Sequence, residues 1–222
     1  MSTLPDLFAV YGASGCGRGV MPLVRAQLAG QGIGPERAVF VDDAPPAAEL
    51  AGHRVLEYDA FLAEPAGRRF ASIAISDGWV RQRIANRLRK DGILSVSVHA
   101  ANIVIMDQVQ IDEGVILSPF VTLTSNIRIG QFFQANLYSY VEHDCEIGNF
   151  VTFAPGVQCN GNVVIEDNVY VGAGAIIKQG RPGQPMRIGR GAVIGMGAVV
   201  TRSVDAGTTV AGVPARVLKR AP

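Results

Sequence analysis

The sequence predicts two parts: a small Rossmann-like α/β domain followed by a left-handed parallel β-helix, the combined class α/β plus all-β. From residue 103 onward, apolar residues recur every six positions. Before that point, short apolar strands alternate with helical stretches. Glycine makes up 26 of 222 residues, above the usual ~7%. The corners of a β-helix need unusual backbone angles, which explains this excess.

The six-residue repeat is the strongest pattern in the chain. Thirteen positions taken six apart, from Ile105 to Ile177, are all apolar. Of the thirteen positions two residues earlier, twelve are apolar. A helix repeats at about 3.6 residues and a strand at 2, so period six predicts one short strand and one turn per hexapeptide. Three hexapeptides form one coil, and both apolar positions point inward and stack on the next coil.

The phase of the repeat breaks after Ile177 and resumes at Ile188. We interpret residues 179–187 as a loop that projects from a coil. In a solenoid, an insertion often lies on a functional or oligomeric face, and a plain surface loop is the alternative. Residues 210–216 are expected to close the last coil.

The N-terminal part alternates strands with helices, which is typical of a parallel sheet. We place the domains at residues 1–98 and 99–222. The expected elements are strands at Leu7–Tyr11, Ala38–Val41 and Ile73–Ile75 and helices at about Val20–Gln31 and Gly78–Lys90.

The charge balance excludes several classes of partner. Twenty basic residues against nineteen acidic ones argue against a nucleic-acid or polybasic membrane partner. The apolar runs are shorter than the ~20 residues of a membrane span, and the N-terminus lacks the basic region of a signal peptide. Three cysteines without metal-ligand spacing favour reduced thiols in a cytoplasmic protein with no metal.

A glycine-rich turn, Gly12-Ala-Ser-Gly-Cys-Gly17, follows the first strand and opens a helix. Backbone N–H groups at such a position attract phosphate. The spacing matches neither the dinucleotide fingerprint nor the P-loop, so an intact NAD site is not expected. Asp42, at the end of the second strand, could bind a ribose or a base edge. The alternative is a tight connection without a ligand.

The three histidines are expected to differ in exposure and role. His53 lies in a polar stretch and is expected to be exposed, and His99 lies where the β-helix begins and is expected to be structural. His143 stands between two inward positions, so it must point outward, with carboxylates on both sides. A carboxylate that hydrogen-bonds an imidazole orients it and raises its basicity, as a general base requires. An ordinary surface histidine is the alternative.

The cysteines are not expected to act as nucleophiles. Cys145 and Cys159 fall on inward positions and are predicted core residues. Cys16 lies in the glycine turn and could line a ligand site, but nothing in the sequence supplies it with a base.

Together these motifs resemble a family of sugar acetyltransferases that join a nucleotide-sugar-binding domain to a left-handed β-helix. The family includes N-acetyltransferases acting on nucleotide-linked 4-amino-4,6-dideoxysugars and enzymes described as sialic acid O-acetyltransferases. The resemblance covers nearly the whole chain and is strongest to the GDP-perosamine N-acetyltransferases of O-antigen, and hence lipopolysaccharide, biosynthesis. The matching motifs are Gly12-Ala-Ser-Gly-x-Gly17, Phe40-Val-Asp-Asp43, Asn136 with Glu142-His143-Asp144-Cys145, and Gly212-Val-Pro-Ala215.

The resemblance implies a direct transfer in which the sugar amine attacks the acetyl-CoA thioester. His143 would be the general base and Asp144 would orient it. The backbone N–H of Gly161 would stabilise the oxyanion, and Asn136 would contact the sugar.

The resemblance also implies binding residues and an assembly. The functional unit would be a homotrimer with each active site between two subunits. Cys16 and Thr152 stand where many relatives have His, and Ser76-Asp77 where relatives often have Gly-Asn. The implied contacts are Ser14, Gly15 and Cys16 for the diphosphate, Asp42 and Asp43 for the base and ribose, and Thr152, Ala173 and Met196 for acetyl-CoA.

Other functions remain open from the residues alone. A sugar O-acetyltransferase would share the fold and the base, and a UDP- or dTDP-linked amino sugar could replace the GDP-linked one. A nucleotide-binding protein without turnover is a further alternative. A β-helix carbonic anhydrase needs several metal-binding histidines, and this chain has three in all.

Overall fold

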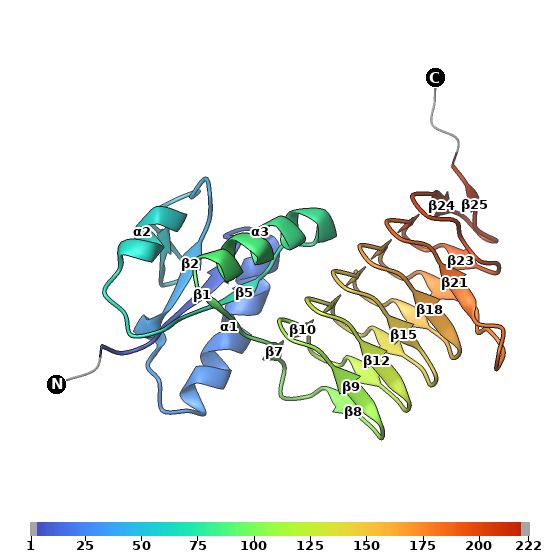
Figure 1. The fold of residues 1–222 in the computed structure, drawn as a ribbon, viewed down its shortest axis with the longest axis horizontal. Helices are drawn as coiled ribbons and strands as arrows, with labels where there is room; N and C mark the ends of the chain where they lie inside the picture. The colour runs from blue at the N-terminus through green and yellow to red at the C-terminus, as the bar shows by residue number, and fades with distance from the viewer. Residues whose placement is uncertain (1–3, 219–222) are drawn as a thin grey trace. The chain divides into compact units, whose positions relative to one another are not determined.

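The computed structural model describes residues 4–218 and shows two compact units (Figure 1). The first unit runs to Ser76 and again from Val80 to His99. The second unit holds Asp77–Trp79 and the chain from Ala100 onward. The first is an α/β sheet domain, and the second is built from stacked short strands, as the sequence predicts.

The first unit is built on a six-stranded sheet of order β3-β4-β2-β1-β5-β6. Its strands pair in parallel, except that β3 pairs with β4 antiparallel. The apolar strand β1 is buried at all five positions and lies between β2 and β5. The strands of this sheet are β1 (Leu7–Tyr11), β2 (Ala38–Val41), β3 (Glu49–Leu50), β4 (His53–Leu56), β5 (Arg69–Ile73) and β6 (Leu94–Ser95), and the helices are α1 (Gly15–Ala29), α2 (Tyr58–Ala63) and α3 (Gly78–Lys90).

Several of the expected elements of this unit are correct. β1, β2 and α3 have the expected bounds. Helix α1 begins at Gly15 rather than near Val20, because the glycine turn itself winds into the first helical turn after Ser14. The expected strand Ile73–Ile75 was wrong, since β5 ends at Ile73. Because β5 begins at the polar residue Arg69, it does not show in the sequence as a run of apolar residues.

The expectation that His53 is exposed was also wrong. His53 is 5% exposed and lies on β4, which the sequence reading did not predict. Its Nδ1 lies 3.0 Å from the carbonyl oxygen of Ala38. Along β4, His53 and Val55 are buried while Arg54 between them is exposed, a short period-two alternation.

Gly17 is the tightest glycine position in the first unit, because a Cβ there would collide with the Gly12 carbonyl oxygen. We therefore expect Gly17→Ala to lower the free energy of unfolding by about 3 kcal/mol or more, measured by denaturant titration. Gly19→Ala in the same helix is the matched control. A Cβ at Gly19 meets open space, so this change should stabilise the protein by about 0.5–1 kcal/mol. Equal effects of the two changes would contradict the argument.

The second unit is a left-handed parallel β-helix of three sheets, one along each face. Strands 18 residues apart pair in parallel, as Val141 pairs with Cys159. The first sheet holds β7 (Val98–His99), β10 (Ile116–Leu117), β13 (Gln134–Ala135), β16 (Thr152–Phe153), β19 (Tyr170–Val171), β22 (Val193–Ile194), β24 (Thr209–Ala211) and β25 (Arg216–Val217). The second holds β8 (Val104–Ile105), β11 (Thr122–Leu123), β14 (Tyr140–Val141), β17 (Gln158–Cys159), β20 (Ile176–Ile177) and β23 (Val199–Val200). The third holds β9 (Val109–Ile111), β12 (Ile127–Ile129), β15 (Glu146–Ile147), β18 (Val163–Ile165) and β21 (Met186–Ile188).

The core of the β-helix consists of the apolar positions that the repeat predicts. Cys145 and Cys159 are 1% and 0% exposed, so the prediction that they are core residues is confirmed. Ile105 departs from the pattern and is 41% exposed. Its strand β8 is at the end of the second sheet, so a coil covers it on one side only.

The corners of the β-helix near His143 have left-handed backbone conformations. Asn126, Asp144 and Asn162 occupy equivalent corners of successive coils with φ of 57°, 58° and 57°. Asn and Asp tolerate this left-handed conformation better than most side chains.

The inserted loop ends at Pro185 rather than at residue 187, because Met186–Ile188 forms β21 and pairs with β18.

Candidate functional site

His143 lies on one edge of the β-helix, at the corner between the second and third sheets. Successive coils bring equivalent residues to this edge, which we call the His143 edge. It comprises residues 106–108, 124–126, 142–144, 160–162, 178–185 and 201–203. The strand register places His143 directly between Ser125 and Gly161 along the edge.

The His143 side chain is 55% exposed and hydrogen-bonded to its neighbour. Its Nδ1 lies 2.8 Å from Oδ2 of Asp144. Oδ1 of the same carboxylate accepts a hydrogen bond from Nδ2 of Asn126, at 3.3 Å. The hydrogen bond to His143 is the main cause that lowers the pKa of Asp144, and Asn126 adds to it. The carboxylate is therefore ionised at neutral pH and holds the imidazole by Nδ1, which leaves Nε2 for chemistry.

Gly161 stands against the ring of His143. A Cβ at Gly161 would lie 2.5 Å from Cε1 and 2.6 Å from Nε2 of that ring, so only glycine leaves room for it. Within residues 4–218, the Gly161 N–H donates to no protein acceptor. A free backbone N–H beside a base is what stabilisation of an oxyanion requires.

The corner that carries Gly161 is held by two hydrogen bonds of Asn160. Its Oδ1 accepts the Tyr140 hydroxyl at 2.9 Å, and its Nδ2 donates to the carbonyl of Ile177 at 2.9 Å. Burial is the main cause that raises the pKa of Tyr140, so this hydroxyl stays protonated and donates at neutral pH. These contacts tie the Gly161 corner to the coils on both sides.

Three other predicted residues lie on a different edge of the β-helix. Asn136, Ala173 and Met196 stand at the corner between the first and second sheets, which we call the Met196 edge. It comprises residues 118–121, 136–139, 154–157, 172–175 and 195–198. Met196 is 81% exposed. Thr152 lies on neither edge, because it belongs to β16 and is 4% exposed.

The glycine turn of the first unit presents the N-terminus of α1. Ser14 is the residue before the helix, and its side chain does not cap it. Ser14 and Gly15 are exposed, whereas Cys16 is half-buried. Burial raises the pKa of the Cys16 thiol, and the Arg81 guanidinium partly opposes this effect. The thiol therefore stays protonated at neutral pH, while the exposed helix start can receive an anion.

Asp42 and Asp43 lie where β2 ends, but their surroundings differ. Asp42 accepts hydrogen bonds from the backbone N–H groups of Ala13 and Ala44, at 2.8 and 3.0 Å. It therefore organises the glycine turn. Asp43 is paired with Arg87 at 2.8 Å and accepts the hydroxyl of Tyr11 at 2.7 Å. Its side chain is 57% exposed, so this carboxylate remains accessible to a ligand.

Comparison with known proteins places the chain in a family. The chain is 46% identical to a GDP-perosamine N-acetyltransferase of Escherichia coli O157:H7, over 98% of both chains. Residues 162–202 match the family described as "Hexapeptide repeat of succinyl-transferase". The chain belongs to the hexapeptide-repeat acetyltransferase family.

Two solved structures extend the similarity to the whole fold. WeeI from Acinetobacter baumannii AYE is 52% identical, with a TM-score of 0.94 over 96% of this chain and 100% of that one. The acetyltransferase domain of PglB from Neisseria gonorrhoeae FA1090, solved with acetyl coenzyme A, is 25% identical, with a TM-score of 0.84 over 97% and 100%. The family resemblance read from the sequence is therefore confirmed.

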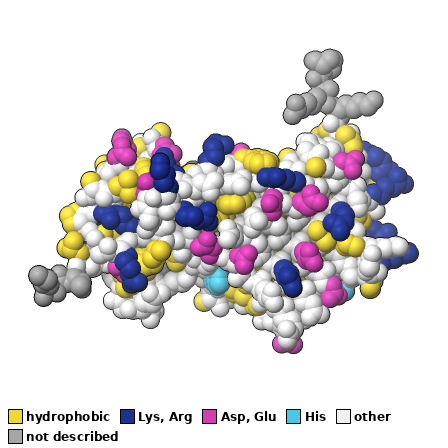
Figure 2. Space-filling model, in the orientation of Figure 1, with side chains coloured by type: hydrophobic (Ala, Val, Ile, Leu, Met, Phe, Trp, Pro, Cys, Tyr) yellow, Lys and Arg dark blue, Asp and Glu magenta, His cyan; other side chains and the backbone are white. Residues whose placement is uncertain are grey.

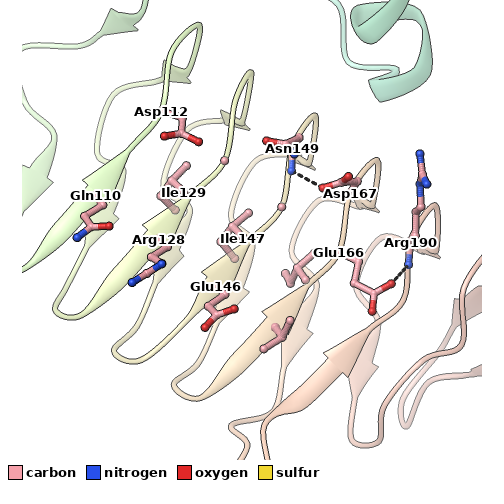
Figure 3. Close-up of a pocket in the computed structure, with 14 residues that line it drawn as sticks. Gln110, Asp112, Arg128, Ile129, Glu146, Ile147, Asn149, Glu166, Asp167 and Arg190 are labelled. Atoms are coloured by element: carbon pink, nitrogen blue, oxygen red, sulfur yellow. Dashed lines mark hydrogen bonds between the residues drawn. The ribbon is translucent and has the colours of Figure 1, made fainter.

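The third face of the β-helix carries an open groove of about 550 Å³ (Figure 3). Along its floor, the outward side chains of Gln110, Arg128 and Glu146 stand on successive strands. Asn149 donates its N–H to Oδ1 of Asp167 at 2.8 Å, a contact that joins neighbouring coils. The groove contains none of the predicted site residues.

Residues 4–218 contain neither a cluster of metal ligands nor a helix that could span a membrane. No cluster of three or more His, Cys, Asp or Glu side chains could hold a metal ion. Among the helices described, none is both long and apolar enough to cross a membrane.

The sequence reading missed Asn126, Tyr140 and Asn160. Asn126 stands 18 residues before Asp144, which is one coil in this fold. Stepping one coil back from each predicted catalytic residue would therefore have identified it. The hydrogen bond between Tyr140 and Asn160 has no such signal in the sequence. The two residues are twenty apart rather than eighteen, because Tyr140 lies on a strand and Asn160 lies at a corner.

Proposed function

We propose that this chain transfers the acetyl group of acetyl-CoA to the 4-amino group of a nucleotide-linked 4-amino-4,6-dideoxysugar, with GDP-perosamine as the preferred acceptor. Two observations carry the proposal. The chain is 46% identical to a GDP-perosamine N-acetyltransferase over 98% of its length, and His143 is hydrogen-bonded to Asp144. The PglB domain, solved with acetyl coenzyme A, supports this donor.

The chemistry follows from the His143 edge. The neutral sugar amine attacks the thioester carbonyl, and Nε2 of His143 takes the proton that the amine loses. Asp144 holds the ring and stabilises the imidazolium that forms. The N–H of Gly161 donates to the oxyanion of the tetrahedral intermediate, an interaction typically worth about 2.7–4 kcal/mol. Collapse of the intermediate expels the CoA thiolate, which His143 can protonate.

The first unit is proposed to hold the nucleotide. The exposed start of α1 at Ser14 and Gly15 suits the diphosphate, with Cys16 lining the site. Asp43 is the better candidate for the base and ribose, because both oxygens of Asp42 already accept backbone N–H groups. Asn136 is proposed to contact the sugar.

A homotrimer is proposed as the functional unit. The His143 edge and the Met196 edge are separate corners of one chain, so a site that uses both needs a second copy. Apolar side chains on the Met196 edge support such packing, since Phe120 and Tyr138 stack at 4.8 Å and are 51% and 64% exposed. Acetyl-CoA is placed against Gly161, Ala173 and Met196, without the buried Thr152.

The proposed setting is the cytoplasm, in O-antigen biosynthesis. The chain is proposed to work without a metal and without a nucleic-acid or membrane partner. The proposed substrates, acetyl-CoA and a nucleotide sugar, are cytoplasmic metabolites, and all three cysteines are free thiols.

Thiol release from acetyl-CoA tests the proposed function. The acceptors are GDP-perosamine, the UDP- and dTDP-linked 4-amino-4,6-dideoxyglucose derivatives, and sialic acid. We expect release with GDP-perosamine. Release with another amino sugar alone would assign a different nucleotide to the acceptor. Release with sialic acid alone would indicate an O-acetyltransferase. A silent panel with retained nucleotide binding would favour a binding protein.

A further inference from the structure

Cys145 differs from the rest of its inward stack, because its thiol can donate a hydrogen bond. The strand register places it beside the start of β15, between Ile127 and Val163. Its equivalents in β9, β12, β18 and β21 are apolar: Val109, Ile127, Val163 and Met186. Charged side chains of both signs stand on the outer surface of the β-helix instead (Figure 2). A donor inside the core, two residues after His143, therefore needs a partner there.

Two backbone carbonyls lie within reach of this thiol. Sγ of Cys145 is 3.3 Å from the carbonyl oxygen of Asn160 and 3.6 Å from that of His143. The His143 carbonyl already accepts the N–H of Asn162 at 2.9 Å. Within residues 4–218, no backbone N–H donates to the Asn160 carbonyl, and the thiol of Cys159 is farther from it, at 3.8 Å. The single hydrogen of the Cys145 thiol therefore belongs with Asn160.

The protonated thiol is the form of Cys145 that suits these surroundings. The hydrogen bond of Cys159 is the main cause that lowers the pKa of Cys145, and burial of the sulfur opposes this effect. The carboxylates of Asp144 and Glu142 also disfavour the thiolate. The sulfur faces two carbonyl oxygens, to which only the protonated thiol can donate. Cys145 is therefore a hydrogen-bond donor at neutral pH.

The carbonyl of Asn160 and the N–H of Gly161 belong to the same peptide group. A trans peptide is planar, so its C=O and N–H point in opposite directions. The thiol that the carbonyl meets is 1% exposed, so this end of the peptide faces the core. The N–H end faces outward, where the His143 ring stands against Gly161. The Asn160 side chain holds the corner through Tyr140 and Ile177, but neither contact reaches this carbonyl.

We propose that Cys145 is a positioning residue for acetyl transfer, whose thiol holds the Asn160–Gly161 peptide so that the Gly161 N–H points at the oxyanion. This inference rests on the proposed function, in which that N–H stabilises the tetrahedral intermediate. A donor at the carbonyl fixes the rotation of the peptide group. It also draws electron density toward the carbonyl oxygen, which makes the N–H a stronger donor. Both effects act on the transition state more than on the bound substrates.

The variants Cys145→Ala and Cys145→Ser test this role, because they differ from each other by one hydroxyl donor. Cys145→Ala should lower kcat for thiol release about 10-fold, while the KM values for acetyl-CoA and the nucleotide sugar stay within about twofold of wild type. Cys145→Ser should keep kcat within about threefold of wild type, since its hydroxyl can replace the thiol as donor. The pH at which kcat falls to half should be the same in both variants as in the wild type, because the base is untouched.

Cys159→Ala is the matched control. It removes a neighbouring core thiol that is 0% exposed and lies 3.8 Å from the same carbonyl. Its melting temperature should fall about as much as that of Cys145→Ala, but its kcat should stay within about twofold of wild type. An equal loss of kcat in both alanine variants would overturn the inference, because kcat would then follow core packing. A Cys145→Ser variant as slow as Cys145→Ala would overturn it as well.

The NMR resonance of the Gly161 amide nitrogen provides a readout that does not depend on activity. An amide nitrogen senses a hydrogen bond at the carbonyl of its own peptide group, so this resonance should shift in Cys145→Ala and return toward its wild-type position in Cys145→Ser. A resonance that stays in place in Cys145→Ala would overturn the inference. A wild-type chain without acetyl transfer would overturn the proposed function and the catalytic role of Cys145 with it, whereas the shift would still establish the contact between the thiol and this peptide.

Discussion

Replacement of His143 by Asn is expected to lower kcat for acetyl transfer by about 10²–10⁴-fold. The amide can still hydrogen-bond to Asp144, so the corner should keep its structure. It cannot take the proton from the attacking amine, however, because an amide is not a base at neutral pH. Steady-state thiol release at saturating acetyl-CoA and nucleotide sugar measures this loss.

The variant Asp144→Asn provides a graded comparison. His143 would keep its place but lose the charged partner of its Nδ1, now 2.8 Å away. A loss of about 10–100-fold in kcat is expected for such a positioning partner. Both variants should retain the wild-type melting temperature within a few degrees, since the two side chains are about half exposed. A His143→Asn variant with kcat near that of the wild type would rule out His143 as the base.

Gly161→Ala is the second change expected to have a large effect. The added methyl would overlap the His143 ring, which must then move away from Gly161. A displacement of about 1 Å at a catalytic group can reduce the rate 10²-fold, so we expect at least this loss in kcat. The KM for the nucleotide sugar should change little, because the contacts proposed for the nucleotide lie in the first unit.

Ser125→Ala controls for substitution at this edge. Ser125 is the equivalent corner residue one coil before His143, and it already carries a Cβ. The change should leave kcat within twofold of the wild-type value. If Gly161→Ala were equally harmless, then neither the close contact with the ring nor the oxyanion role of this corner would hold.

The sequence predicted the β-helix and the outward position of His143 because a period of six is a strong constraint. Once the inward positions are known, a residue between two of them must face outward. The same spacing places Gly161 one coil beyond His143, although its role came from the family resemblance. The close contact between Gly161 and the imidazole ring needed coordinates, because corner geometry decides it.

The first unit was harder to predict because its strands are short and partly polar. Strand β5 begins at Arg69, and β4 holds His53 in a buried position. Neither strand shows as a continuous apolar run. The role of Asp42 was equally hidden, because its backbone partners at Ala13 and Ala44 depend on how β2 lies beside the glycine turn.

The position of the acetyl group on the product tests the central claim most directly. Wild-type protein and His143→Asn would be incubated with acetyl-CoA and GDP-perosamine, and the product would be examined by mass spectrometry and NMR. We expect one acetyl group, as an amide on the 4-amino nitrogen, formed by the wild type and at least ~10²-fold more slowly by the variant. An ester on a sugar hydroxyl, or amide formation at the same rate by both proteins, would contradict the assignment of His143 as the base of an N-acetyltransferase.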